Sequence, residues 1–131
     1  LKSTGGLAID TTELTIDFTS DNAWTGSQRA TYVTDNDGSY DLDAGQNFIT
    51  TPSGTTTITF TTGGTNMSSA SSNGQSGFIK LINSGGETIS LGTAANGAAG
   101  MGTTLSTTGT YLLSYFSDGT NVWLTNSAIY A

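Results

Sequence analysis

The chain has no cysteine, no histidine and a single proline among its 131 residues. Without thiolate or imidazole ligands it cannot build a zinc site of the usual kind, an iron–sulfur cluster or a histidine-based catalytic triad. Without cysteine it forms no disulfide, so cysteine usage does not indicate a redox compartment. These absences exclude metal centres that depend on cysteine or histidine ligands and hydrolases that depend on a histidine of their own.

Positive charge is also scarce, since Lys2, Arg29 and Lys80 stand against ten acidic residues and the net charge is −7. Nucleic-acid binding needs several cations to neutralise phosphates, so we expect no nucleic-acid partner. Apolar runs reach only about five residues, against the roughly 20 that cross a bilayer, so we expect no membrane insertion. The chain starts at Leu1 rather than Met and shows no secretory leader, which suggests processing or a trimmed fragment.

Threonine, serine and glycine dominate the composition, with 26, 16 and 18 residues respectively. Hydrophobic residues make up only 34%, which is low for a chain that must bury roughly two thirds of its unfolded surface. Either buried threonines or further copies of the chain must therefore complete the core, and we favour an oligomer. Five Phe, five Tyr and two Trp in alternating segments argue against disorder.

Apolar residues recur with period two, which predicts strands rather than helices. Segment 77–83 is apolar on both sides apart from Lys80, as is typical of a central strand of a sandwich. Asp118-Gly119, between two alternating segments, predicts a β-hairpin. No eleven-residue window shows a helical stripe. Other alternating segments are residues 14–18, 57–61, 111–116 and 121–125. The spacing predicts an all-β fold of about eight to ten short strands, a sandwich or barrel.

The first residues differ from the rest because two apolar-x-Ile-Asp steps, ending at Asp10 and Asp17, lie seven residues apart. Such steps suggest a short strand-and-turn repeat in an extended arm, although two ordinary edge strands explain them equally well. We therefore divide the chain into an extended arm or fibre-like segment, residues 1–23, and a globular β domain, residues 24–131.

Several motifs in the globular part resemble a known family. They include Trp24-Thr25-Gly26-Ser27-Gln28-Arg29-Ala30, Gly74-Gln75-Ser76-Gly77 and Leu113-Ser114-Tyr115-Phe116-Ser117-Asp118-Gly119-Thr120-Asn121. In this order and spacing, the chain resembles the jelly-roll-like domain of tailed-bacteriophage virion surface proteins. The resemblance implies an antiparallel β-sandwich of jelly-roll type, a homotrimer and a location on the virion surface.

On this basis we expect a non-enzymatic structural protein of a phage virion, most simply a trimeric tail-fibre or receptor-binding component. Its partners would be copies of itself, other virion proteins of the tail or capsid, and a glycan or protein on the host surface. The alternative is a capsid decoration (cement) or head-fibre protein that stabilises the shell. A more distant alternative is a secreted carbohydrate-binding module.

Four residues are candidates for recognition or for contact between subunits. Trp24 and Trp123 carry aromatic faces suited to sugar rings, and Trp123 alternates with Val122 and Leu124, so we expect it either exposed or at a subunit interface. Met67 and Met101 lie in the expected loops 62–76 and 93–103, where an adaptable apolar side chain suits contact with another protein.

Asp35, Asp37 and Asp41 are calcium candidates, because Ca²⁺ prefers several oxygen ligands and alternating acids in a turn supply them. The EF-hand frame fails, since aligning Asp37-Gly38 with its fifth and sixth positions puts Val33 at the first. We favour an acidic hairpin turn built on Asp-Gly and keep calcium as a minor alternative. No cofactor and no metal centre is expected otherwise.

Catalytic residues are not expected. In residues 44–131 the only acids are Glu87 and Asp118, each in a predicted turn beside glycine. A glycosidase needs two carboxylates facing each other across a cleft, one with a raised pKa, and solvated turn residues do not meet that need.

Overall fold

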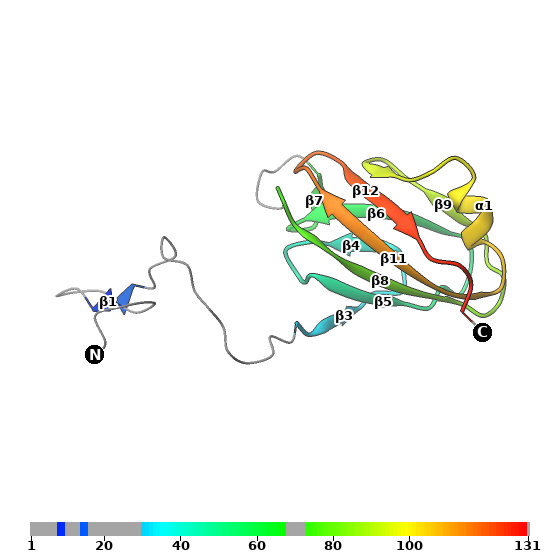
Figure 1. Ribbon diagram of the computed structural model, residues 1–131, viewed down its shortest axis with the longest axis horizontal. Helices are drawn as coiled ribbons and strands as arrows, with labels where there is room; N and C mark the ends of the chain where they lie inside the picture. Colours follow the sequence, from blue (N-terminus) through cyan, green and yellow to red (C-terminus); the bar gives the residue numbers. More distant parts are fainter. Residues whose placement is uncertain (1–7, 10–13, 16–29, 68–72, 131) are drawn as a thin grey trace.

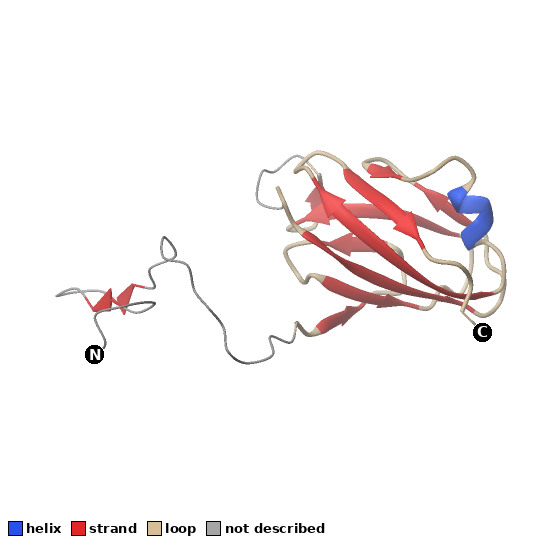
Figure 2. Cartoon of the chain, in the orientation of Figure 1, coloured by secondary structure: helices blue, strands red, loops and turns tan. Residues whose placement is uncertain are grey.

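The computed structural model describes residues 8–9, 14–15, 30–67 and 73–130. These residues are mostly strand, with one short helix (Figure 2). In chain order the elements are β1 (Ala8–Ile9), β2 (Leu14–Thr15), β3 (Tyr32–Thr34), β4 (Ser39–Asp41), β5 (Asn47–Thr50), β6 (Thr56–Thr62), β7 (Thr65–Asn66), β8 (Ser76–Asn83), β9 (Ile89–Leu91), β10 (Ala95–Asn96), α1 (Met101–Leu105), β11 (Gly109–Ser117) and β12 (Val122–Asn126). The predicted all-β class is confirmed.

Residues 30–67 and 73–130 form two sheets that lie one over the other (Figure 1). The six-stranded sheet has the order β10-β12-β11-β8-β5-β3, with the two longest strands, β8 and β11, at its centre. The four-stranded sheet is organised around β6, which pairs with β4, β7 and β9. The predicted hairpin is present, since β11 and β12 pair antiparallel on either side of Asp118-Gly119.

The core fills the space between the sheets. Alternate residues of β11, Tyr111, Leu113 and Tyr115, are buried on the inner face of the six-stranded sheet. Across the gap, the ring of Phe60 on β6 lies 5.9 Å from that of Tyr115, centroid to centroid. Several polar side chains share this core: Thr50, Thr56, Thr62, Asn83 and Ser117. Buried threonines therefore supply part of what the low hydrophobic content lacks.

The predicted antiparallel arrangement of jelly-roll type is wrong for much of the structure. Five described strand pairs are parallel: β3 with β5, β5 with β8, β4 with β6, β6 with β9 and β10 with β12. Strands β3 and β5 lie in one sheet while β4 and β6 lie in the other. From β3 to β6 the chain thus changes layer at each turn and returns to each sheet in the same direction. These mixed sheets do not make a clear jelly roll.

A short helix lies where the sequence shows no helical stripe. Helix α1 has five residues, too few for an eleven-residue pattern, and it buries Met101 and Leu105, one turn apart, against the core. Gly100 precedes it with φ of 81°, a left-handed conformation that glycine adopts without strain.

The expected arm, residues 1–23, lies outside the described residues except for β1 and β2. These two strands pair antiparallel, with Ala8 opposite Thr15 and Ile9 opposite Leu14. Trp24 also lies outside the described residues.

Candidate functional site

The outward face of the six-stranded sheet carries most of the exposed large apolar side chains among the described residues. Strand register places Trp123 opposite Phe116, and it places Phe78 opposite Ser114 on the same face. Each of these three aromatic side chains is about half exposed, at 54%, 49% and 52% for Trp123, Phe116 and Phe78. Further exposed apolar residues on or beside this face are Tyr32, Leu112, Ile129 and Tyr130. An exposed apolar patch of this extent is a feature of binding surfaces.

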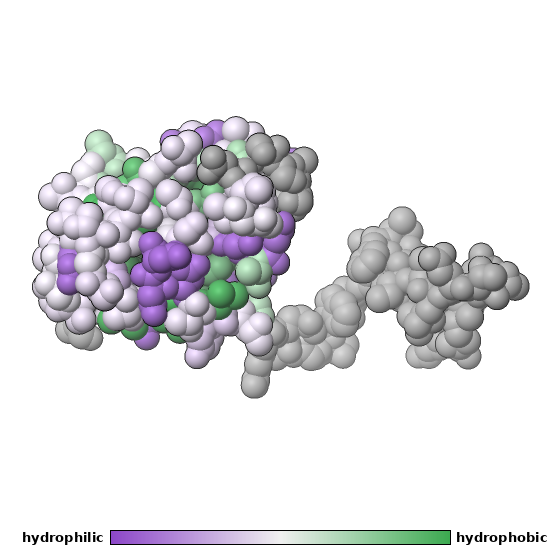
Figure 3. All heavy atoms as spheres, turned by 180° about the vertical axis from the view of Figure 1, so that it is seen from behind, coloured by the Kyte–Doolittle hydropathy of each residue, from purple (hydrophilic) through white to green (hydrophobic). Residues whose placement is uncertain are grey.

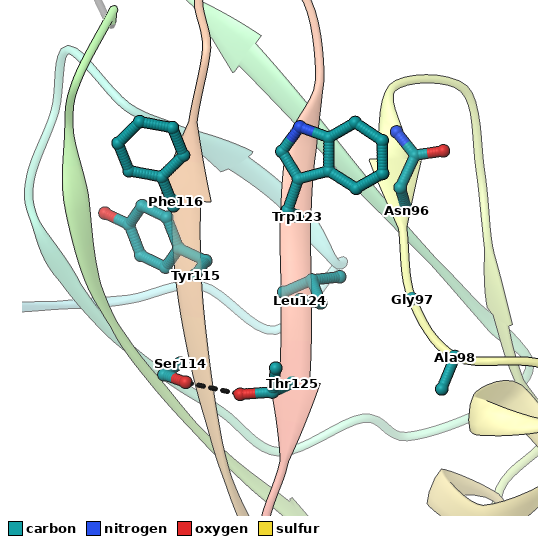
Figure 4. A pocket seen from close by; sticks show the side chains of 9 residues that line it. All are labelled: Asn96, Gly97, Ala98, Ser114, Tyr115, Phe116, Trp123, Leu124 and Thr125. Atoms are coloured by element: carbon teal, nitrogen blue, oxygen red, sulfur yellow. Dashed lines mark hydrogen bonds between the residues drawn. The ribbon is translucent and has the colours of Figure 1, made fainter.

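A shallow hollow of about 450 Å³ lies over β10, β12 and β11. Figure 4 shows the rings of Phe116 and Trp123 side by side on neighbouring strands, with the amide of Asn96 beside the indole. The floor is crossed by a hydrogen bond of 2.6 Å between the hydroxyls of Ser114 and Thr125. The hollow therefore combines two aromatic faces with neutral hydrogen-bonding groups.

The indole of Trp123 is held in place although it is exposed. Its Nε1–H donates to Oδ2 of Asp118 over 3.0 Å. The other oxygen of Asp118 accepts the backbone N–H groups of Thr120 and Asn121 at 2.9 and 2.7 Å. The hydrogen bond from Trp123, followed by these backbone bonds, lowers the pKa of the Asp118 carboxyl below its usual value. The hairpin turn thus fixes the orientation of an aromatic side chain that the core does not use.

A second hollow, of about 400 Å³, adjoins the first on the other side of β11. Ser114 and Tyr115 line both hollows, and the second is completed by Gln46, Asn47 and Phe78 from β5, β8 and the turn before β5. Its amides are also positioned: Gln46 donates to the carbonyl of Ser76 at 2.8 Å, and Asn47 accepts the backbone N–H of Phe78 at 3.2 Å. We call these two depressions the paired hollows.

No charged side chain lines the paired hollows among the residues that the structure describes. Lys80 lies on the same face but outside both hollows, opposite Leu112. Figure 3 shows the other side of the molecule, where pale and hydrophilic residues predominate and hydrophobic atoms are scattered. The exposed aromatic side chains of the described residues gather on or beside the outward face of the six-stranded sheet.

The calcium candidates do not come together as a site. Asp41 uses both carboxylate oxygens on backbone N–H groups, Oδ1 on Asp43 and Gly63 at 3.0 Å each and Oδ2 on Gly64 at 3.1 Å. Asp35 and Asp37 accept backbone N–H groups two residues onward, as turn residues do. Burial, and then the neighbouring Asp37, raise the pKa of Asp35. Across the described part of the chain, no three acidic side chains gather to hold a metal ion.

The two methionines, expected in exposed loops, are buried. Met67 and Met101 are 8% and 3% exposed and belong to the hydrophobic core. Met67 follows β7, and Met101 opens α1, which turns its side chain inward. Their burial corrects the interpretation of both residues as apolar contacts for another protein.

The motifs that carry the family resemblance have a structural role. The side-chain amide of Gln75 donates to the carbonyls of Leu42 and Gly45, each at 3.0 Å, and the hydroxyl of Tyr115 donates to the carbonyl of Gln46 at 2.8 Å. Gly77 lies against that same carbonyl, where a side chain would overlap it. Gln75, Gly77 and Tyr115 thus hold the 42–46 turn against the six-stranded sheet, whereas Ser114 and Phe116 of the same motifs line the paired hollows.

Sequence reasoning missed several members of the paired hollows. Segment 77–83 is a central strand as predicted, and its Phe78 is exposed because no layer covers the outward face in the described structure. Because successive side chains of a strand point to opposite faces, the sequence already indicates that Phe116 lies on the other face of the sheet from Tyr115. Asn96 had no local signal, since it reaches the site only because β10 pairs with β12 in parallel, with Asn96 opposite Trp123.

The two acids of residues 44–131, Glu87 and Asp118, do not form a catalytic pair. Glu87 follows β8 and Asp118 follows β11, and these strands are antiparallel neighbours. The two carboxylates therefore lie at opposite ends of the sheet, about 25 Å apart for strands of this length. Within the described residues, no helix is long and apolar enough to cross a membrane.

Comparison of the chain with protein-family models, with curated proteins and with solved structures finds no match.

Proposed function

We propose that the chain is a non-enzymatic structural protein of the virion surface of a tailed phage, that it forms a homotrimer, and that it serves as a tail-fibre or receptor-binding component. The resemblance of residues 24–131 to virion surface proteins supports the location. The exposed aromatic side chains of the six-stranded sheet, around hollows with no charged residue in their described lining, support the binding role and are the observation that carries the proposal.

It is unusual for a chain with only 34% hydrophobic residues to expose several large apolar side chains on one face. The core between the sheets is already complete, with Tyr111, Leu113 and Phe60 almost fully buried. A further layer of apolar side chains exposed to water adds nothing to the stability of a single chain, so its place is in contact with another molecule. Catalysis has no comparable support, because Glu87 and Asp118 lie at opposite ends of the sheet.

Contacts between copies are proposed at the corner of the outward face that lies beyond the paired hollows. Leu112, Ile129 and Tyr130 are exposed there, and Tyr130 bridges to Thr110 through its backbone N–H at 2.8 Å. Lys80 is the one charged residue beside this corner that the structure describes. In a chain of net charge −7, a face almost free of acids is where two copies approach with least repulsion.

Light scattering coupled to size exclusion tests this assembly. We expect a mass three times that of the 13.4 kDa chain, falling toward one chain in Leu112→Glu. The control Thr88→Glu adds the same charge at an exposed position before β9 and should leave the trimer intact. A monomer in the unchanged chain would contradict the trimer.

Immunogold electron microscopy of the phage particle that carries the chain tests the location. Gold on the tail or its fibres is the expected result. Gold spread over the head would instead show a decoration protein and refute the receptor-binding role. Particles without label, once antibody access to the epitope is demonstrated on purified assembly, would refute the virion proposal altogether.

A further inference from the structure

We infer that the paired hollows bind a neutral oligosaccharide, stacked on Trp123 and Phe116 and continued toward Phe78. The inference deepens the proposed receptor-binding role and rests on it for its biological meaning, because it names the chemical class of the receptor. The binding chemistry itself is argued from the hollows alone.

The aromatic side chains supply the first requirement for a sugar site. A pyranose ring presents C–H groups on its faces and hydroxyls around its rim, so it packs its faces against the electron-rich faces of aromatic rings. Phe116 and Trp123 stand directly opposite each other on β11 and β12, and both rings are exposed. Figure 4 shows them side by side above the Ser114–Thr125 pair.

Neutral polar groups supply the second requirement. Amides and hydroxyls donate and accept hydrogen bonds without charge, which matches the rim of a sugar. The first hollow offers Asn96 and the Ser114–Thr125 hydroxyl pair, and the second offers Gln46 and Asn47. Each of these side chains is already held by a hydrogen bond within the protein, so little side-chain entropy is lost on binding.

Charge selects the class of glycan. The described lining of the hollows holds no acid and no base. Asp118 accepts the indole N–H of Trp123 but lines neither hollow. Because the chain carries a net charge of −7, it repels glycans with carboxylate, sulfate or phosphate groups. A neutral glycan is therefore the matching ligand.

The size and arrangement of the hollows indicate an oligosaccharide rather than a single sugar. Their volumes are about 450 and 400 Å³, and Ser114 lines both. Each volume falls in the range of a small-molecule site. Consecutive sugar rings of one oligosaccharide can occupy the two hollows on either side of β11. Phe116 and Trp123 would then lie under the rings in the first hollow, and Phe78 under those in the second.

The test is titration calorimetry with four neutral hexasaccharides as probes: maltohexaose, cellohexaose, mannohexaose and chitohexaose. We expect at least one to bind with millimolar Kd or better. For that probe, Trp123→Ala and Phe116→Ala should each weaken binding at least tenfold, while Trp123→Phe, which keeps an aromatic face, should retain most of the affinity. Tyr32→Ala is the matched control, since Tyr32 is an exposed aromatic on the same face that lines neither hollow.

Fluorescence gives a second readout on the unmodified site. In Trp24→Phe, Trp123 is the sole tryptophan, and sugar stacked on it should change its emission and protect it from acrylamide. Failure of all four probes to bind, or equal loss of affinity in Tyr32→Ala and Trp123→Ala, overturns the inference. A trimer that already shields Trp123 from acrylamide and that dissociates in Trp123→Ala also overturns it, because another copy of the chain would then occupy the hollows.

The two proposals fail separately. Sugar binding with particles that carry no gold label would remove the virion role and leave the oligosaccharide site. Gold on the tail with no sugar binding would keep the virion role and refute the oligosaccharide.

Discussion

Two fully buried tyrosines should respond differently to the same substitution. Tyr40 and Tyr111 are both 0% exposed. The hydroxyl of Tyr111 lies 2.8 and 2.9 Å from the carbonyl oxygens of Thr104 and Thr107, where it ties the end of α1 to β11. The hydroxyl of Tyr40 has no hydrogen-bond partner in the described structure. We predict that Tyr111→Phe destabilises the protein and that Tyr40→Phe does not.

The expected magnitudes follow from what each hydroxyl does. Removing the Tyr111 hydroxyl loses hydrogen bonding worth about 1 kcal/mol and leaves carbonyl oxygens at the end of α1 poorly satisfied, for a total of about 1–3 kcal/mol. Removing the Tyr40 hydroxyl relieves a buried polar group, so stability should stay the same or rise by about 1 kcal/mol. The Tyr40 ring keeps its contacts with Phe48 and Phe60, whose centroids lie 5.1 and 5.6 Å away.

Thermal unfolding followed by circular dichroism measures the difference. For a folded body of this size, about 1 kcal/mol shifts Tm by about 4 °C. Tyr111→Phe should therefore lower Tm by about 4–12 °C, while Tyr40→Phe should leave it unchanged or raise it by up to about 4 °C. Thr50 lies near the Tyr40 phenol and favours its ionised form, but the two hydroxyls do not meet in hydrogen-bonding geometry. A fall in Tm with Tyr40→Phe comparable to that with Tyr111→Phe would refute this reasoning.

Three further predictions concern stability. Gly77→Ala should lower the free energy of unfolding, measured in urea, by about 2–3 kcal/mol because the new methyl would overlap the carbonyl of Gln46. Gly54→Ala, where the new methyl meets open space, should be close to neutral. Equal effects of the two variants would contradict the close approach of β5 and β8. Ala94→Gly should stabilise by up to about 1 kcal/mol, because Ala94 has φ of 68°, and a clear loss of stability would show that this strain is absent. Burial raises the pKa of the Tyr40 and Tyr115 phenols. Above about pH 10 the unfolded chain therefore binds fewer protons than the native one, and the free energy of unfolding should fall as pH rises. A urea midpoint as high at pH 11 as at pH 9 would contradict this.

Local patterns predicted the strands well because a strand with one buried face carries an apolar residue at every second position. Segments 57–61 and 111–116 lie within β6 and β11, and the Asp118-Gly119 turn closes the β11–β12 hairpin with Gly119 at φ of 88°. The outward direction of Trp123 followed from the same alternation, and it is confirmed.

Strand direction and the composition of the site were beyond local patterns. Whether β5 runs parallel to β8 depends on the layer changes between them, which alternation does not record. Asn96 joins Trp123 only through a parallel pairing of distant segments. Met101 looked like a loop residue because glycines surround it, yet one helical turn with Leu105 buries it. The site could therefore be predicted as one exposed tryptophan, but not as paired hollows.

Adsorption of the phage to its host in the presence of the purified chain tests most directly whether the paired hollows make the attachment. We predict that the unchanged chain and Tyr32→Ala slow adsorption by competing for the receptor, and that the double variant Phe116→Ala/Trp123→Ala does not. Equal competition by all three proteins, or none by the unchanged chain, would contradict attachment through this face.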